Sequence, residues 1–167
     1  MKEAALVILK PDAMVKRLAG YVLTRLEESG LELVGAKLVK VIRPLAEEHY
    51  FSHRKKFFFK EIVSYLSGKI HHCAGVFVFV YWGRNANQKC RDIAGATNPE
   101  EADFKSIRGS CGRVTTKGIY ENVIHVSATA KEAEREIKLW FKPDDILVKV
   151  YKTKIDFLKN RKEKVWA

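Results

Sequence analysis

The sequence predicts a single α/β sandwich domain in which helices cover one face of a β-sheet. Strand-like and helix-like apolar patterns alternate along the chain in the order β-α-β-α-β-α-β-α. A length of 167 residues fits one domain and is sufficient for a hydrophobic core. With 47% hydrophobic and 31% charged residues, the composition excludes collagen, a coiled-coil rod and a fully disordered chain.

The first half of the chain carries two strand patterns and three helix patterns. A short apolar run over residues 6–9 predicts a buried strand. Apolar residues recur at helical spacing over 18–26, ahead of a Ser-Gly stop. Residues 31–42 are rich in β-branched and aliphatic side chains and predict a second strand. Two short helices follow, over 44–50 and 59–66.

The second half begins with the pattern of a central strand at residues 76–81, which are nearly all β-branched or aromatic. Residues 86–94 predict a helix with Asn85 as its cap, and Cys73 is expected to begin the preceding strand. A long irregular stretch then runs to residue 121, and loops of this length are usually functional. A short strand over 122–126 and a capped helix up to Phe141 complete the predicted domain.

Positive charge is concentrated at the C-terminal end. Lys and Arg number 31 against 20 Asp and Glu, and +5 of the net +11 falls within residues 148–167. We therefore predict one folded domain over residues 1–147, followed by a basic tail over residues 148–167. The tail is either a solvated segment or a contact for nucleic acid.

The sequence favours a cytoplasmic protein. No apolar run approaches the roughly 20 residues of a spanning helix, and the first residues are too short and badly flanked for a signal peptide. Three cysteines without a Cys-x-x-Cys pair argue against a disulfide framework and a zinc site.

Phosphate binding, if it occurs, must use side chains, because the sequence has neither a P-loop nor a Gly-x-Gly-x-x-Gly motif. Lys10 directly follows the first strand, Arg91 lies in a helix, and Thr97 and Arg108 lie on the long loop. Each one alone is most simply a solvated residue. Together they could form a cationic clamp for phosphates.

His125 is the residue of most chemical interest. It lies in a short strand, Asn122 precedes it, and Glu132 and Glu136 follow on the next helix. A carboxylate bound to one imidazole nitrogen would leave the other free as a nucleophile. The alternative is a hydrogen-bonded core histidine. Metal binding by His49 and His53, four residues apart, is a further alternative.

Several segments that carry these residues occur in an order that resembles nucleoside diphosphate kinases over about residues 4–141. They are Val7-Ile-Leu-Lys-Pro-Asp-Ala13, Leu45-Ala-Glu-Glu-His-Tyr50, Gly95-Ala-Thr-Asn-Pro99, Ser106-Ile-Arg-Gly109, Asn122-Val-Ile-His125 and Ala133-Glu-Arg-Glu-Ile-Lys-Leu-Trp-Phe141. The resemblance implies a ferredoxin-like βαββαβ fold with a four-stranded antiparallel sheet covered by helices. It also implies transfer of the γ-phosphate of a nucleoside triphosphate to a nucleoside diphosphate, by a ping-pong route through phosphohistidine.

The same resemblance implies roles for individual residues. His125 would carry the phosphate and Glu136 would orient it, with Tyr50 lining the site. Phe58 would stack on the base, and other side chains would hold the phosphates and the ribose 3′ hydroxyl: Lys10, Arg91, Thr97, Arg108 and Asn122. Mg²⁺ would be held mainly by the phosphates of ATP, ADP, GDP and other nucleotides, without a protein metal site. The protein would form a homo-oligomer, a dimer-based tetramer or hexamer.

The chain departs from the family pattern in four places. Phe57 stands where a proline is common, the segments 69–75 and 109–121 look extended, and Ala128 replaces an acidic residue, which could weaken a link to magnesium. None of these removes a residue that the mechanism requires. A nucleic-acid-binding protein on the same scaffold, using the basic tail, is the alternative function.

Overall fold

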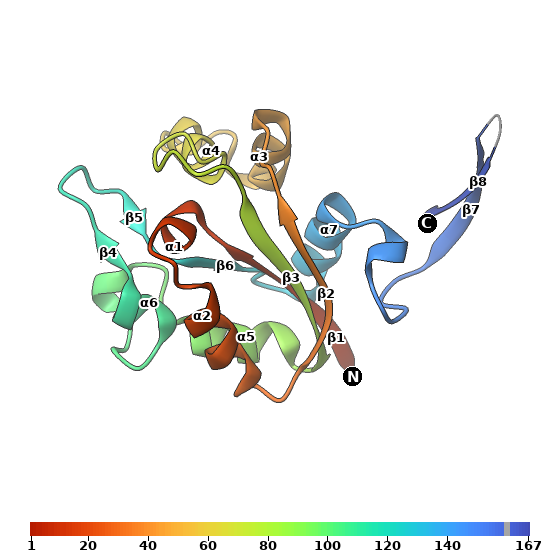
Figure 1. Cartoon of the computed structure of the whole chain (residues 1–167), viewed down its shortest axis with the longest axis horizontal. Helices are drawn as coiled ribbons and strands as arrows, with labels where there is room; N and C mark the ends of the chain where they lie inside the picture. Colours follow the sequence, from red (N-terminus) through yellow and green to blue (C-terminus); the bar gives the residue numbers. More distant parts are fainter. Residues whose placement is uncertain (159–160) are drawn as a thin grey trace.

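The computed structural model describes residues 1–158 and 161–167 and has a four-stranded sheet at its centre (Figure 1). Strand β1 (Lys2–Leu9) lies between β3 (Val76–Arg84) and β6 (Ile124–Val126), and β2 (Glu32–Val39) pairs with the outer side of β3. The order is β2-β3-β1-β6 and all pairings are antiparallel. This is the ferredoxin-like arrangement expected from the sequence.

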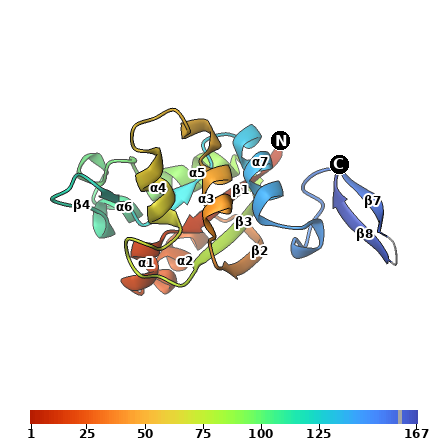
Figure 2. The same cartoon turned by 90° about the horizontal axis from the view of Figure 1, so that it is seen from above.

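Helices cover both faces of the sheet, so the expectation of one covered face was wrong. Ala4, Leu6 and Ile8 of β1 pack on one side, against α3 (Arg43–His49), α4 (Phe59–Leu66) and α7 (Ala130–Trp140). The intervening residues Ala5, Val7 and Leu9 face the other side. That side is covered by α1 (Pro11–Val15), α2 (Ala19–Glu27), α5 (Ala86–Ala94) and α6 (Ile107–Cys111). Figure 2 shows the same layers from above.

The stretch expected to be irregular contains short elements. After the 3₁₀ turn η2 (Pro99–Glu101), helix α6 begins where the Ser106 hydroxyl accepts a hydrogen bond from the Gly109 amide. Two-residue strands β4 (Arg113–Val114) and β5 (Tyr120–Glu121) then form a small separate ladder. Another 3₁₀ turn, η1 (Phe51–His53), lies between α3 and α4. These elements bring residues 95–121 back to the end of β6.

Asn85 is the cap residue of α5, as expected, but its backbone lies in the left-handed region at φ 53° and its side chain makes no cap hydrogen bond. The expectation for Cys73 was wrong. Cys73 lies before β3 rather than in it, and its thiol donates to the Gly75 carbonyl at 3.0 Å. Neither difference alters the sheet, because the apolar run that defines β3 begins at Val76.

The C-terminal segment contains a hairpin that the sequence analysis did not anticipate. After α7 comes the 3₁₀ turn η3 (Pro143–Asp145), followed by β7 (Thr153–Leu158) and β8 (Arg161–Trp166). These two strands pair only with each other among the described strands. In Figures 1 and 2 the hairpin extends away from the central sheet. Within the described residues, no helix has the length and apolarity needed to span a bilayer.

Candidate active site

The ends of β1 and β6 bring the first predicted site residues together. Ile8 pairs with His125 in the sheet, and the Lys10 amide donates to the Val123 carbonyl at 2.8 Å. The Lys10 ammonium donates to the Asn122 side-chain oxygen at 2.6 Å. The amide group of Asn122 in turn donates to the carbonyl of Thr97 at 2.8 Å. Lys10, Asn122 and Thr97 are therefore linked directly, although they come from three distant parts of the sequence.

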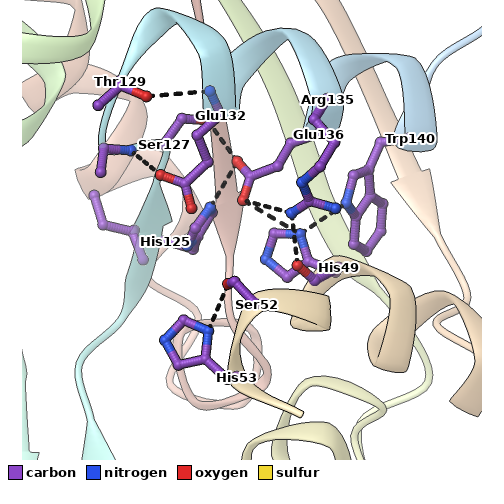
Figure 3. Close-up of polar contacts among 12 residues, drawn as sticks. His49, Ser52, His53, His125, Ser127, Thr129, Glu132, Arg135, Glu136 and Trp140 are labelled. Carbon is purple, nitrogen blue, oxygen red and sulfur yellow. Dashed lines mark hydrogen bonds and ion pairs between the residues drawn. The ribbon is translucent and has the colours of Figure 1, made fainter. Parts of the chain in front are cut away.

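His125 is oriented by a carboxylate on α7 (Figure 3). Its Nε2 lies 2.9 Å from Oε2 of Glu136, and the hydroxyl of Ser127 donates to the same oxygen at 2.5 Å. The Glu136 side chain is 1% exposed, whereas that of His125 is 17% exposed. Because a carboxylate can only accept, Nε2 carries the proton in neutral imidazole and Nδ1 has the lone pair. No partner of Nδ1 is found among the residues that the structure describes.

The local sequence of α7 explains how Glu136 reaches the histidine. The hydroxyl of Thr129 caps the helix by accepting from the Glu132 amide, and the Glu132 carboxylate accepts from the Ala128 amide at 2.7 Å. This differs by one residue from a regular capping box, whose carboxylate would bind the amide of the cap residue itself. The helix starts three residues after β6, and Glu136, nearly two turns into the helix, faces back onto the strand.

The Glu136 carboxylate is kept ionised by its neighbours. Burial alone would raise its pKa, but the charge and hydrogen bond of His125, together with His49 and Ser127, lower the pKa to about 2. The carboxylate is therefore charged throughout the neutral range. A permanent negative charge at Nε2 favours the tautomer that leaves Nδ1 unprotonated.

His49 is a member of the site that sequence reasoning did not place there. Its ring packs edge-on against that of His125, with centroids 4.5 Å apart, and its Nδ1 accepts from the Trp140 indole at 3.2 Å. The same Nδ1 lies 3.6 Å from Glu136. Burial, and then the proximity of His125, lower the pKa of His49 well below its ordinary value. His49 is therefore a neutral neighbour of the catalytic pair.

The metal pair considered from the sequence is not formed. His49 faces Glu136 and His125, and the ligand atoms of these three residues lie within 4.8 Å of one another. His53 instead contacts the Ser52 hydroxyl at 2.9 Å (Figure 3). Within this group, His125 Nε2 is bound to Glu136 and His49 Nδ1 to Trp140, whereas His49 Nε2 is buried and has no hydrogen-bond partner among the described residues.

Buried positive charge gathers beside His125. The guanidinium of Arg108 is mostly buried and donates to the carbonyls of Gly95 and Ile124 at 2.8 and 2.9 Å. Burial, and then the charge of the exposed Arg91 on α5, lower the pKa of Arg108 to about 10. Burial likewise lowers the pKa of Lys10 to about 8, with opposing effects of Asp12 and Arg108. Arg108 therefore lies close enough to Lys10 and to Arg91 for their charges to interact, and the phosphate clamp stays a prediction.

Aromatic rings extend from the histidine pair toward the expected base site. Tyr50 contacts His49 with ring centroids 4.7 Å apart, and His53 lies 6.1 Å from Tyr50 and 5.8 Å from Phe58. Burial, followed by the charge of Glu136, raises the pKa of Tyr50, so its hydroxyl remains protonated. Phe57, in the place of the usual proline, is exposed and packs edge-on against Phe58 at 5.3 Å.

A ferredoxin-like sheet that presents a carboxylate-bound histidine beside clustered cations defines a protein suited to accept phosphoryl groups. Comparison with known proteins identifies which family this is. The family model for nucleoside diphosphate kinase matches residues 3–146. The Pyrococcus furiosus nucleoside diphosphate kinase is 44% identical over 144 residues, 86% of each chain, and that of Staphylococcus haemolyticus is 42% identical over 86% of this chain and 91% of its own.

Solved structures give the same result. The Halobacterium salinarum nucleoside diphosphate kinase in complex with CDP is 35% identical, with a TM-score of 0.79 over 89% of this chain and 93% of its own. The Borrelia burgdorferi enzyme, a transition-state mimic with bound vanadate and ADP, is 34% identical with a TM-score of 0.78, over 90% and 92% of the two chains. This chain belongs to the nucleoside diphosphate kinase family, as the sequence motifs predicted, and is a phosphotransferase.

Proposed function

We propose that this chain transfers the terminal phosphate of a nucleoside triphosphate to a nucleoside diphosphate, with His125 Nδ1 as the temporary acceptor. One observation carries the assignment: Glu136 binds Nε2 and leaves Nδ1 as the nitrogen with a lone pair, near the partly buried Lys10 and the buried Arg108. A neutral imidazole is a competent nucleophile near neutral pH.

The reaction is balanced by two displacements at phosphorus. In the first, the Nδ1 lone pair attacks the γ-phosphorus, the bond to the β,γ-bridging oxygen breaks, and the nucleoside diphosphate leaves with that electron pair. The Nε2 proton stays on the ring, hydrogen-bonded to Glu136. In the second, a terminal phosphate oxygen of another nucleoside diphosphate attacks the same phosphorus and regenerates neutral His125.

The remaining side chains are assigned to binding and positioning. Lys10, Arg91, Thr97 and Arg108 hold the phosphates, because spread negative charge in the transition state is stabilised by fixed cations. Lys10 and Asn122, already joined at 2.6 Å, contact the ribose 3′ hydroxyl. Phe58 stacks on the base, which tolerates ATP, ADP, GDP and other nucleotides because every base has a π face. Tyr50 lines the site beside His49.

The residues present fit a magnesium ion that arrives with the nucleotide. Mg²⁺ prefers oxygen ligands and commonly binds through phosphates and water. Ala128 offers no carboxylate, and the Glu132 carboxylate is bound to the Ala128 amide. When bound, Mg²⁺ supplies charge neutralisation of the phosphate oxygens. Lys10 and Arg108 complement this by binding the oxygens that face the protein.

We also propose a cytoplasmic homo-oligomer, a dimer-based tetramer or hexamer. The proposal rests on the family resemblance and on the edge strand β2, where Leu38 is exposed, followed by exposed Ile42. Exposed apolar side chains on an edge strand favour pairing with a second copy. Light scattering on the full chain checks this assembly, and a monomer at micromolar concentration would contradict it.

The test of the reaction is phosphoenzyme formation. Incubation with γ-labelled ATP is expected to label the protein with an alkali-stable, acid-labile phosphate that passes to added GDP. His125→Ala should abolish the label. His53→Ala, which removes an imidazole from the same neighbourhood but not from the pair with Glu136, should retain it. An unlabelled wild type, or equal labelling of the His125 variant, would overturn the proposal.

A further inference from the structure

We propose that residues 148–158 and 161–167 belong to an arm that binds single-stranded nucleic acid, outside the phosphotransfer site. The family model ends at residue 146, so the arm is an addition to the common domain. It consists of an approach segment over 148–152 and the hairpin of β7 and β8. The proposal rests on this arm alone and is independent of the chemistry at His125.

The arm is fixed to the body at its base. The indole of Trp166 donates to the Phe141 carbonyl at 2.7 Å, and Lys142 pairs with Glu163 at 2.7 Å. Lys164 pairs with Asp144 of η3. Beyond these contacts the hairpin extends away from the central sheet (Figure 1). An isolated two-stranded hairpin is marginally stable in water. The contacts at the base stabilise this hairpin, and its outer part remains available to bind a ligand.

The arm presents lysines that have no carboxylate partner. Lys149, Lys152, Lys154 and Lys162 make no ion pair within the described residues, and all four are exposed. Lys149 and Lys152 line a groove of about 520 Å³ between the approach segment and α7, which also includes Tyr151. The acidic side chain in this groove, Glu134, is already paired with Lys138 at 2.9 Å. Lys138 also donates to an oxygen of Ala167, another residue of the groove, at 3.1 Å. Lys138 therefore engages both oxygen acceptors, and Lys149 and Lys152 remain without an ion pair among the described residues.

One face of the hairpin adds apolar and aromatic surface to this charge. Residues directly opposite each other in an antiparallel pair lie on the same face, and every second residue of a strand shares that face. Ile155 and Phe157 are therefore on one face, with Lys162 opposite Phe157. Ile155 is 51% exposed and Phe157 is 72% exposed. The Lys162 ammonium lies 5.4 Å from the Phe157 ring centroid, leaving the other ring face open.

These features form a backbone-binding groove followed by a stacking platform. Lys152 and Phe157 are separated by five residues of nearly extended chain, about 17 Å. Proteins that bind single strands combine such a cationic track with aromatic rings on which the bases stack. A duplex is a poorer match, because its bases are already stacked on each other.

Charge complementarity selects a polyanion over a second copy of this chain. The chain has a net charge of +11, of which the arm contributes +5, so two arms, or an arm and another body, repel each other. An anionic membrane could bind the lysines but has no aromatic group to stack on Phe157. Insertion into lipid also requires a broader apolar face than Ile155 and Phe157 provide. A single strand can bind the lysines through its phosphates and stack a base on the exposed ring.

The test measures fluorescence anisotropy of labelled oligo(dT) and oligo(rU) of about 15 nucleotides with the full chain, across a salt series. The variant Lys149→Gln/Lys152→Gln/Lys162→Gln, which changes the two groove lysines and the lysine opposite Phe157, should weaken binding at least about tenfold at low salt. It should also reduce the slope of log K against log salt by about 2, as expected for three lost phosphate contacts. Phe157→Ala should weaken binding about 5- to 150-fold with an unchanged slope.

A matched control removes the same charge elsewhere. Lys40→Gln/Lys69→Gln/Lys117→Gln alters three exposed lysines that have no ion pair within the described residues. It should change affinity by less than about twofold. The two oligomers distinguish RNA from DNA as the ligand, and either one that responds to the arm variants supports the proposal.

The outcomes that would overturn it are equally specific. Wild type that fails to bind at low salt, or an equal loss in the arm and control variants, would exclude a dedicated surface. Competition of oligomer binding by excess ATP with no effect of the arm variants would place the strand at the phosphotransfer site. Binding to phosphatidylserine vesicles without binding to oligomers would indicate a membrane partner. A change of oligomeric state in Phe157→Ala, measured by sedimentation, with oligomer binding unchanged, would indicate a subunit contact.

Discussion

The site around His125 and the arm at residues 148–167 use the same types of side chain in opposite ways. In the site, Glu136 is almost completely buried and binds a histidine and a serine. In the arm, Glu163 is partly exposed and pairs with Lys142 at the surface. Phe58 of the site lies beside other rings, whereas Phe157 of the arm is largely exposed.

The difference teaches where a substitution will have consequences. When a polar side chain of the site around His125 is removed, its buried neighbours lose a hydrogen-bond partner, which costs stability. When a charged side chain of the arm is removed, water can solvate its former partner, so the loss of stability is small. Pairs of equivalent substitutions, one in each region, therefore separate effects on phosphotransfer from effects on the surface.

The largest contrast is expected between Glu136→Gln and Glu163→Gln. In Glu136→Gln a neutral amide replaces the negative charge beside Nε2, so the tautomer with a free Nδ1 is less favoured and phosphoenzyme formation should slow by about 10²- to 10³-fold. Glu163→Gln should leave the rate unchanged, because its partner Lys142 is at the surface. Rapid-quench labelling with γ-labelled ATP measures both.

Glu136 also has an expected effect on stability in acid. The pKa of Glu136 in the folded protein is about 2, below its ordinary value of 4.5, so this carboxylate adds stability above pH 4.5 that is lost as the pH falls toward 2. Glu136→Gln should flatten the fall in the free energy of unfolding across this window, measured by urea titration. A variant as fast as wild type, with the same acid dependence, would remove Glu136 from its orienting role.

A smaller contrast is expected between Phe58→Ala and Phe157→Ala. Loss of a stacking ring costs about 1–3 kcal/mol per base, so Phe58→Ala should raise KM for nucleotides about 5- to 150-fold with a modest change in kcat. Phe157→Ala should leave both constants unchanged, since it lies on the arm. If steady-state assays with ADP and GDP find an unchanged KM for Phe58→Ala, the base does not stack there.

The sequence was sufficient to place those site residues that lie in short motifs. Lys10 follows a strand, and His125 and Glu136 are joined by a capped helix start, so their proximity follows from local spacing. His49 could not be placed in this way. Its contacts with His125 and Trp140 cross from α3 to β6 and α7, and a sequence pattern does not report packing between distant elements.

Two features of the fold had usable signals. Six consecutive buried residues in β1, from Ala4 to Leu9, indicate a strand covered on both faces, as is usual for continuous apolar runs. In the arm, residues 154–157 alternate polar and apolar side chains, which is the pattern of a strand. The high proportion of lysines favoured the prediction of a basic tail instead of a strand. The short strands β4 and β5 had no such signal, because two-residue pairings depend on tertiary contacts.

A third contrast concerns pH and sets Lys10 against Lys154. Burial lowers the pKa of Lys10 from 10.5 to about 8, so the free enzyme loses this positive charge as the pH rises through 8. Nucleotide phosphates restore it, and binding should take up a proton near pH 8–9. KM should therefore rise above pH 8, by at most about tenfold per pH unit. Lys10→Gln should have a high KM without this rise, whereas Lys154→Gln should follow the wild-type profile.

Calorimetry in buffers of different ionisation enthalpy measures the proton uptake directly. The effect on stability has the opposite sense: between pH 8 and 10.5 the unfolded chain binds the proton that folded Lys10 has lost, so this group makes the free energy of unfolding rise with pH. An identical KM profile for wild type and Lys10→Gln would exclude Lys10 as the source of the pH dependence.

The smallest effects are expected from Trp140→Phe and Trp166→Phe, each of which removes one indole N–H donor. Trp140 donates to His49, whose Nδ1 also lies near Glu136, and Trp166 donates to the Phe141 carbonyl at the base of the arm. Trp140→Phe leaves a buried nitrogen unpaired, which should cost about 1–3 kcal/mol. His49 can then shift its proton to Nδ1 and donate to Glu136, competing with His125 and lowering the rate of phosphoenzyme formation several-fold.

Trp166→Phe should cost about 1 kcal/mol and leave phosphotransfer unchanged, because water can reach the freed carbonyl at the partly exposed base of the arm. Urea denaturation and quench labelling of both variants make the comparison. Equal losses of rate would mean that the arm and the site around His125 are coupled through α7, which carries Trp140 and leads directly into Phe141. A loss confined to Trp140→Phe would instead show that the contacts at the base of the arm do not influence the histidine site.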